Sequence, residues 1–243
     1  MFSRRCKMLS LIEGDVFDIL PGMPKAQCLI ADPPDNISTK YKNSKDNMPE
    51  RKYRHFMSEC LYLFTSKANT TWVSYNAKWT YPMGDIINSF LITNNEFEAK
   101  PFIQTFTFGQ HNSRDCGNGH RPILRLRHKD APLYPDQIRV PSWRLLNGDK
   151  RADIRGCVPL DIWPFPRVTG NSKQRRKYHP NQLNENLVAR MIQLSTKEGD
   201  TVYDAFSGTG TTLRVCKQFN RNCISIESDS YYCEKLKEEH PEI

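Results

Sequence analysis

The sequence predicts a single α/β domain in which helices and strands alternate, because three segments carry that pattern. Residues 27–31 form a short apolar run that ends at two prolines, as a buried strand does. Helical spacing of apolar residues over 53–66 precedes a strand-like alternation over 70–75. Residues 201–227 are typical of a strand, a glycine turn, a helix and a second strand. A chain of 243 residues can bury the core of one such domain that carries a small insertion.

The remaining elements follow from weaker signals. Residues 83–92 have helical spacing, and residues 103–108 and 122–126 have the composition of strands. Asn184 is a suitable N-cap for a helix with one apolar face. That face comprises Leu187, Val188, Met191, Ile192 and Leu194.

The stretch 129–178 shows no periodic element and contains prolines, charges and isolated aromatic residues. A segment of this length without regular structure is more often a functional surface than a connection. Its aromatic and basic side chains suit contacts with phosphates and with base edges. They include Trp143, Arg144, Trp163, Phe165, Arg167, Arg175, Arg176 and Lys177.

Composition indicates an anionic partner. The chain has 35 Lys and Arg against 27 Asp and Glu, a net charge of +8, and phosphate neutralisation by such residues favours binding to nucleic acid. There is no apolar run long enough to span a membrane and no secretory signal, so we expect a cytoplasmic or nucleoid-associated protein without a membrane partner. The eight cysteines lack CxxC spacing, which is typical of reduced thiols.

The glycine turn predicts a site for an adenosine-containing cofactor. Gly208 and Gly210 would let a ligand approach bare backbone, and Glu227, at the end of the next strand, could hold both ribose hydroxyls. Leu213 stands where a dinucleotide site needs a small residue, which disfavours NAD. Asp204, just before the turn, could bind the amino group of a methionine moiety.

A second motif, Asp32-Pro33-Pro34, follows the strand at 27–31. The prolines fix the Asp32 carboxylate and the local carbonyls at the carboxyl edge of the sheet, where open α/β folds bind ligands. An exocyclic amine is a poor nucleophile because its lone pair is delocalised into the ring. Acceptance of its hydrogens at Asp32 and at a prolyl carbonyl favours direct attack on a sulfonium methyl group.

Together these motifs resemble the circularly permuted DNA amino-methyltransferases, in which the catalytic motif precedes the cofactor motif. Here the catalytic motif spans 32–34 and the cofactor motif spans 204–212. The resemblance implies a Rossmann-like methyltransferase fold, a mixed seven-stranded sheet flanked by helices, with S-adenosylmethionine as cofactor. It also implies methylation of a flipped base in double-stranded DNA. Adenine N6 is the favoured target and cytosine N4 is the alternative.

The resemblance extends over nearly the whole chain. Gly14-Asp15 resembles the opening segment of the family, whose aspartate lies near the cofactor adenine, and residues 179–182 resemble its HPTQ segment. Residues 1–128 and 179–243 would form the catalytic domain, with 129–178 in place of the target-recognition region. The residues expected to bind cofactor are Asp15, His179, Asp204, Phe206, Gly208, Gly210, Thr211, Thr212 and Glu227.

Two positions depart from the family pattern. Asp35 stands where an aromatic residue usually stacks on the flipped base, and Leu183 replaces a lysine. The stacking ring would then come from Tyr41, on a basic loop expected over 36–54 to be mobile without DNA, or from Trp79. The expected catalytic residues are therefore Asp32, Pro33, Pro34 and Tyr41. A non-catalytic protein that binds nucleic acid, an RNA substrate and a homodimer all remain compatible with the sequence.

Two other chemistries fit less well. His111, Cys116 and His120 lie in a Gly/Asn-rich loop, but three ligands at this spacing match no usual zinc pattern, so we predict no metal site. Methylation at a ring carbon needs an activated cysteine next to a proline in a catalytic loop, and the sequence contains no such segment.

Overall fold

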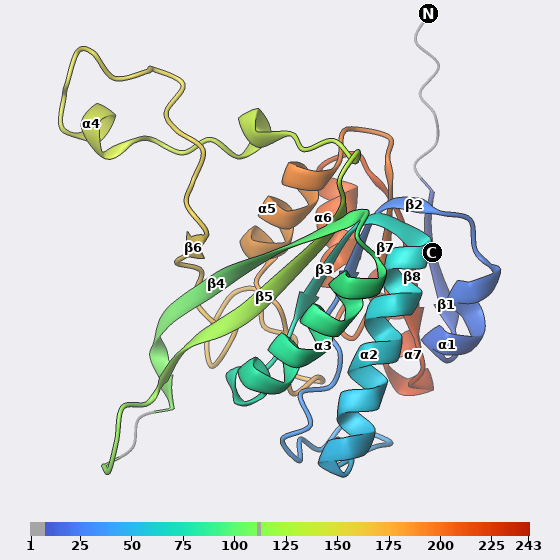
Figure 1. The fold of residues 1–243 in the computed structure, drawn as a ribbon. Coiled ribbons are helices and arrows are strands. Elements are labelled where there is room, and N and C mark those ends of the chain that lie inside the picture. The colour runs from blue at the N-terminus through green and yellow to red at the C-terminus, as the bar shows by residue number, and fades with distance from the viewer. Residues whose placement is uncertain (1–7, 111–112) are drawn as a thin grey trace, which may run out of the picture.

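The computed structural model describes residues 8–110 and 113–243, which form an eight-stranded mixed sheet flanked by helices (Figure 1). The strand order is β1-β8-β7-β2-β3-β5-β4-β6. Strands β1, β8, β7, β2 and β3 are parallel, β5 is antiparallel to both β3 and β4, and β6 is parallel to β4. The strands are β1 (Leu9–Glu13), β2 (Ala26–Ala31), β3 (Ala68–Ser74), β4 (Phe97–Gln110), β5 (Asn118–His128), β6 (Ile162–Trp163), β7 (Thr201–Asp204) and β8 (Asn222–Glu227).

The predicted methyltransferase-like α/β architecture is confirmed, with one strand more than expected. The additional strand is β6, which has only two residues and pairs with β4 at the edge of the sheet. It lies within 129–178, where no periodic element was predicted. A pair of residues is too short for a periodicity signal, so this strand depends on its partner rather than on its own sequence.

Helices cover both faces of the sheet. They are α1 (Val16–Ile19), α2 (Glu50–Lys67), α3 (Thr80–Thr93), α4 (Trp143–Leu146), α5 (Glu185–Ser195), α6 (Thr211–Gln218) and α7 (Ser230–Glu239). Three short 3₁₀ turns lie at Leu20–Gly22, Ala77–Trp79 and Pro135–Ile138. None of the helices in the described part of the chain is long and apolar enough to cross a membrane.

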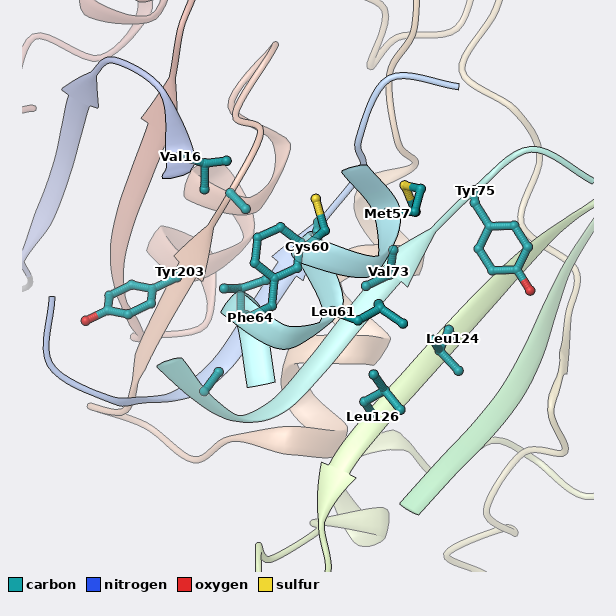
Figure 2. Packing of buried hydrophobic residues seen from close by; sticks show 14 of the residues in the cluster. Val16, Met57, Cys60, Leu61, Phe64, Val73, Tyr75, Leu124, Leu126 and Tyr203 are labelled. Carbon is teal, nitrogen blue, oxygen red and sulfur yellow. The ribbon is translucent and has the colours of Figure 1, made fainter. Parts of the chain in front are cut away.

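Two hydrophobic cores hold these layers together. On one face, α1, α2 and α3 pack against the sheet, and Figure 2 shows Leu61 of α2 beside Val73 of β3. On the other face, α5 and α6 pack on a core centred on Trp72. Each fully buried large apolar side chain stabilises the fold by about 1.5–3 kcal/mol.

Helix α5 begins as the sequence predicts. The Asn184 side chain accepts a hydrogen bond from the backbone N–H of Asn186 at 2.9 Å, which satisfies one of the free donors of the first turn. The apolar residues of this helix are buried in the second core. The N-cap prediction is therefore confirmed.

The chain reverses its winding direction between β7 and β2. From β7 the chain passes through α6 to β8 on one side, whereas from β2 it passes through α2 to β3 on the other. The two strands are hydrogen-bonded neighbours, with Ile30 opposite Asp204. Open α/β sheets bind ligands at such a point, outside the carboxyl ends of the strands. Both predicted motifs leave the sheet at this place.

The basic loop is shorter than predicted. Helix α2 starts at Glu50, so Arg51, Lys52 and Arg54 lie on a helix and only 36–49 forms a loop. The prediction of a loop to residue 54 was wrong, because basic side chains on the exposed face of an amphipathic helix resemble a solvated connection in sequence. In the loop, Lys40 pairs with Lys45 as an antiparallel bridge.

The segment 129–178 is anchored at both ends and projects in the middle. Ile138 and Trp163 are buried in the second core, while the portion that carries α4 extends away from the sheet (Figure 1). Trp143 is 78% exposed and Ile154 is 86% exposed. The hairpin of β4 and β5 also reaches beyond the helices (Figure 1).

Candidate active site

A cavity lies at the point where the winding reverses, and both motifs line it. The DPP turn contributes from the end of β2, and the glycine turn contributes from the end of β7. Eleven of the thirteen predicted site residues line this cavity. They are Asp32, Pro33, Pro34, Tyr41, His179, Asp204, Phe206, Gly208, Thr211, Thr212 and Glu227.

The other two predicted residues lie outside the cavity lining. Asp15 is the N-cap of α1, where its Oδ1 accepts the backbone N–H of Phe17 at 2.8 Å. Gly210 is the N-cap of α6, in a left-handed conformation with φ of 70°. A Cβ at this position would lie 2.5 Å from Cδ2 of Leu236. Gly210 therefore shapes the turn through close packing rather than through contact with the cavity.

Gly208 and His179 meet at the floor of the turn. Gly208 has a φ of 51°, and a Cβ there would lie 3.2 Å from Nε2 of His179. His179 is buried, its Nδ1 contacts the carbonyl oxygen of Asn181, and its ring packs edge-on against Tyr232. Burial lowers the pKa of His179 to about 4. The imidazole is consequently neutral at neutral pH.

Glu227 ends β8 and is held by backbone donors. Its Oε2 accepts the N–H of Gly208 at 2.7 Å, and its Oε1 accepts the N–H of Asp229 at 2.9 Å. Burial raises the pKa of this carboxyl group, although the two backbone bonds partly offset the effect. The glycine turn and the carboxylate thus fix each other's position.

Asp204 is the last residue of β7 and is buried at 3% exposure. Burial raises its pKa to about 7, with hydrogen bonds from the Thr212 side chain and the Phe206 backbone opposing the shift. Glu227 and Asp32 raise it further through their negative charges. A carboxylate kept here is poorly solvated and would gain from a cationic ligand group.

Asp32 is held by two residues that sequence reasoning missed. Nη2 of Arg121, on β5, donates to Oδ1 of Asp32 at 2.6 Å, and the Ser74 hydroxyl donates to the same oxygen. Nε of Arg121 also donates to Oγ of Ser74 at 3.0 Å. Ser74 could have been found, since it ends β3, the strand that pairs in parallel with β2. Arg121 could not, because its place depends on the antiparallel register of β5.

Asp35 is buried at 5% exposure. Its two carboxylate oxygens accept from Nη1 and Nη2 of Arg121, both at 2.9 Å. Its backbone carbonyl accepts from Nε1 of Trp79 at 2.7 Å. Trp79 is itself 3% exposed and packs against Tyr53 in the first core. The hypothesis that Trp79 stacks on a base was therefore wrong.

Tyr41 lies on the side of the cavity formed by the glycine turn. Its ring is 5.6 Å from that of His179, measured between centroids. The next two residues tie the loop to α7: the N–H of Lys42 donates to the Tyr232 hydroxyl at 3.1 Å, and the Asn43 side chain donates to Asp229 at 2.7 Å. The loop thus covers one side of the cavity.

A second cavity adjoins the first and shares Asp32, Asp35 and Arg121 with it. The phenyl ring of Phe106, on β4, is part of its lining, and the Arg167 guanidinium lies 5.5 Å from the centroid of that ring. Its other lining side chains include Asn76, Gln104, Asn118 and His120. Leu183 borders both cavities.

Of the three potential zinc ligands, His111 lies outside the described residues. Cys116 is an exposed free thiol, and His120 borders the second cavity. Across 8–110 and 113–243, no group of three or more His, Cys, Asp or Glu residues is arranged to hold a metal ion.

Comparison with known proteins agrees with this geometry. The profile of a family described as DNA methylase matches residues 26–238, which include both motifs. The chain belongs to this DNA methylase family. The type II methyltransferase M.HpaI of Haemophilus parainfluenzae is 33% identical over 243 residues, which cover 97% of this chain and 72% of that protein. The predicted membership among the amino-methyltransferases is thereby confirmed.

Solved structures show the same fold. The M1.HpyAVI–SAM complex superposes with a TM-score of 0.62 at 20% identity and covers 96% of this chain and all of the other. The PvuII DNA methyltransferase, described as cytosine-N4-specific, superposes with a TM-score of 0.70 at 14% identity over 93% of this chain and 84% of its own. DNA methylases of this family depend on S-adenosylmethionine, so the predicted cofactor is confirmed.

Proposed function

We propose that this DNA methylase transfers a methyl group from S-adenosylmethionine to the exocyclic amino group of a flipped base in double-stranded DNA, adenine N6 in preference to cytosine N4. The observation that carries the proposal is that Asp32 and Asp204, at the ends of two paired strands, line one cavity. One motif can bind the acceptor amine and the other the methyl donor. The donor supplies an electrophilic methyl group on a sulfonium.

The residues around the first cavity fit this cofactor. We assign Asp204 to its ammonium group, because a buried carboxylate with a raised pKa gains from a cation. Glu227 would accept the ribose hydroxyls with the lone pairs that its backbone donors leave free. Gly208 and the neutral His179 would form an uncharged side of the cavity that the cofactor can approach closely. Asp15 adjoins Gly14, whose N–H bonds to the carbonyl oxygen of Glu227 at 2.9 Å.

The reaction requires little movement of protons within the protein. The Asp32 carboxylate and the Pro33 carbonyl accept the two amine hydrogens, which localises the lone pair on nitrogen. The nitrogen then forms a bond to the methyl carbon as the carbon–sulfur bond breaks, and the extra proton on nitrogen leaves by way of Asp32. Among the described residues, Ser74 and Arg121 both donate to Oδ1 of Asp32, which leaves Oδ2 for the amine.

The first test is an assay of product. Incubation with methyl-labelled S-adenosylmethionine and mixed-sequence duplex DNA should place label in the DNA, and nucleoside digestion should release N6-methyladenine. Heat-denatured DNA and duplex RNA serve as comparison substrates. N4-methylcytosine as sole product would reject the adenine assignment, whereas calorimetric binding of the cofactor without any label in nucleic acid would favour the non-catalytic alternative.

The second cavity is the better candidate for the flipped base. It shares Asp32 with the first cavity and contains Phe106, whose ring can stack on a base where Asp35 cannot. Tyr41, the ring expected from the sequence, lies instead beside His179. We therefore propose Phe106 as the stacking residue and Tyr41 as part of the cofactor wall.

Paired variants separate these two roles. Phe106→Ala should reduce kcat/KM for DNA by about tenfold or more, since base stacking contributes about 1–3 kcal/mol, and should leave cofactor affinity unchanged. Tyr41→Ala should weaken cofactor binding severalfold. Tyr81→Ala, which removes an aromatic ring that is 89% exposed on α3, is the control. Loss of turnover in Tyr41→Ala at unaltered cofactor affinity would return the stacking role to Tyr41.

Recognition of the DNA sequence is proposed for 129–178, with 1–128 and 179–243 as the catalytic domain. The support is the projection of this segment from the sheet (Figure 1) and the exposure of its cationic side chains. Arg144, Arg151 and Arg155 are exposed but pair locally with Asp149 or Asp153. Contact with phosphates would therefore exchange these local pairs for the DNA backbone.

A further inference from the structure

We propose that Arg121 is a positioning residue for methyl transfer, which turns Asp32 toward the target amine, and that Asp35 holds Arg121 in place. This inference rests on the function proposed above. None of the sequence motifs contains Arg121, and Asp35 directly follows the DPP motif.

Asp32, Ser74 and Arg121 form a closed set of three hydrogen bonds. Arg121 and Ser74 both donate to that oxygen, and Arg121 also donates to Oγ of Ser74 at 3.0 Å. A carboxylate held at one oxygen by two donors has a fixed plane. The amine can then approach only the other oxygen, Oδ2.

The guanidinium is shared between two carboxylates, which fixes its own plane. Asp35 accepts from both terminal nitrogens at 2.9 Å in a bidentate pair, the strongest and most directional arrangement for arginine. The side chains are shielded from solvent, with 6% exposure for Asp35 and 19% for Arg121. Two carboxylates and one guanidinium leave one net negative charge beside the cavity.

The charges around Asp32 affect its pKa and therefore its ability to accept a proton. Burial raises the pKa of Asp32 and Asp35 raises it further, whereas Arg121 and Ser74 lower it. Tyr41, Tyr53 and Asp204 also interact electrostatically with Asp32. Without Arg121, a larger share of Asp32 would be protonated, and a protonated carboxyl group is a weaker acceptor that cannot take up the proton released from the amine.

Asp35 therefore serves as an anchor for Arg121. Neighbouring side chains hold the backbone that carries it. The Tyr53 hydroxyl donates to the Pro34 carbonyl at 2.8 Å, and Trp79 donates to the Asp35 carbonyl. The DPP turn and the residue that follows it are thus held by side chains of α2 and of the turn before α3.

The test compares Asp32 titration among variants of the full chain. Carboxyl carbon-13 NMR, with Asp32 assigned from an Asp32→Asn spectrum, gives its pKa without turnover, and the pH dependence of kcat gives it during methyl transfer. Arg121→Met should raise the pKa of Asp32 by about one to three units and move the acid limb of kcat upward, and Arg121→Lys should restore part of the difference. Arg125→Met removes another buried arginine of β5, one that pairs with Glu98, and should leave Asp32 unaffected.

Arg121→Met leaves the carboxylates of Asp32 and Asp35 side by side without the guanidinium. A second variant, Asp35→Asn, avoids this because it keeps the guanidinium and removes one carboxylate. Removal of this negative charge acts directly to lower the pKa of Asp32, and the weaker hold on Arg121 should lower the plateau value of kcat. An unchanged Asp32 titration in Arg121→Met would overturn the positioning role of Arg121, and an unchanged plateau value of kcat in Asp35→Asn would overturn the anchoring role of Asp35. Because NMR titration needs no substrate, a protein that fails to methylate DNA would disprove the proposed function while this result still decides the role of Arg121.

Discussion

Asp32→Ala is expected to lower the rate of methyl transfer to DNA by about 100- to 10,000-fold, the range typical of a lost general acid–base group. The substitution removes the acceptor that localises the amine lone pair. Arg121 would keep its bidentate pair with Asp35, so the guanidinium would not be left without a partner. Single-turnover measurement with labelled cofactor and saturating DNA gives the rate.

Cofactor affinity separates a chemical defect from a folding defect in this variant. It should stay within a few fold of the unmodified protein, because Asp32 is assigned to the amine rather than to the methyl donor. Asp85→Ala, which removes an exposed aspartate that pairs with Arg54, is a matched control and should retain full activity. Asp32→Ala with a rate within tenfold of the control would remove Asp32 from the mechanism.

Affinity for S-adenosylmethionine should fall as the pH drops below about 7, by about tenfold per pH unit at the steepest point. The pKa of Asp204 is raised to about 7, and only its ionised form attracts an ammonium group. Binding is therefore strongest above pH 7 and weakens as Asp204 takes up a proton. Glu227 also has a raised pKa and acts in the same direction. His179 has a pKa of about 4 and stays neutral through this range.

Calorimetric titrations between pH 5.5 and 8.5 would measure this dependence. Asp204→Asn should lower affinity by about 100-fold at pH 8, the loss of a charge-assisted contact, and should flatten the pH dependence to the part that Glu227 supplies. Asp200→Asn changes an aspartate four residues upstream that bonds the Lys197 N–H and does not line the cavity. Affinity independent of pH in the unmodified protein would contradict the ammonium assignment to Asp204.

The elements that sequence reasoning located are those with strong local signals. The strand that ends at Ala31, the N-cap at Asn184 and the glycine turn at 208–210 all lie where expected. Local chemistry determines each of them: prolines end a strand, an amide caps a helix, and glycine permits a left-handed turn. The two motifs met in one cavity because the carboxyl ends of neighbouring parallel strands share an edge.

The features that could not be predicted from the sequence depend mainly on pairing between distant segments. Strand β6 exists through its contact with β4, and Arg121 reaches Asp32 through the register of β5 against β3. The start of α2 was missed because its first turns carry mostly charged residues. Asp35 was noticed as a departure, but its meaning required the arginine that it binds.

Strand β2 leaves the ribosome long before its partner β7, because residues 26–31 are synthesised early and residues 201–204 late. Until β7 arrives, β2 has a neighbour on one side only, β3, and the DPP turn has no cofactor turn facing it. A chain interrupted before residue 201 therefore lacks β7 and β8, and with them Asp204, the glycine turn and Glu227 of the first cavity.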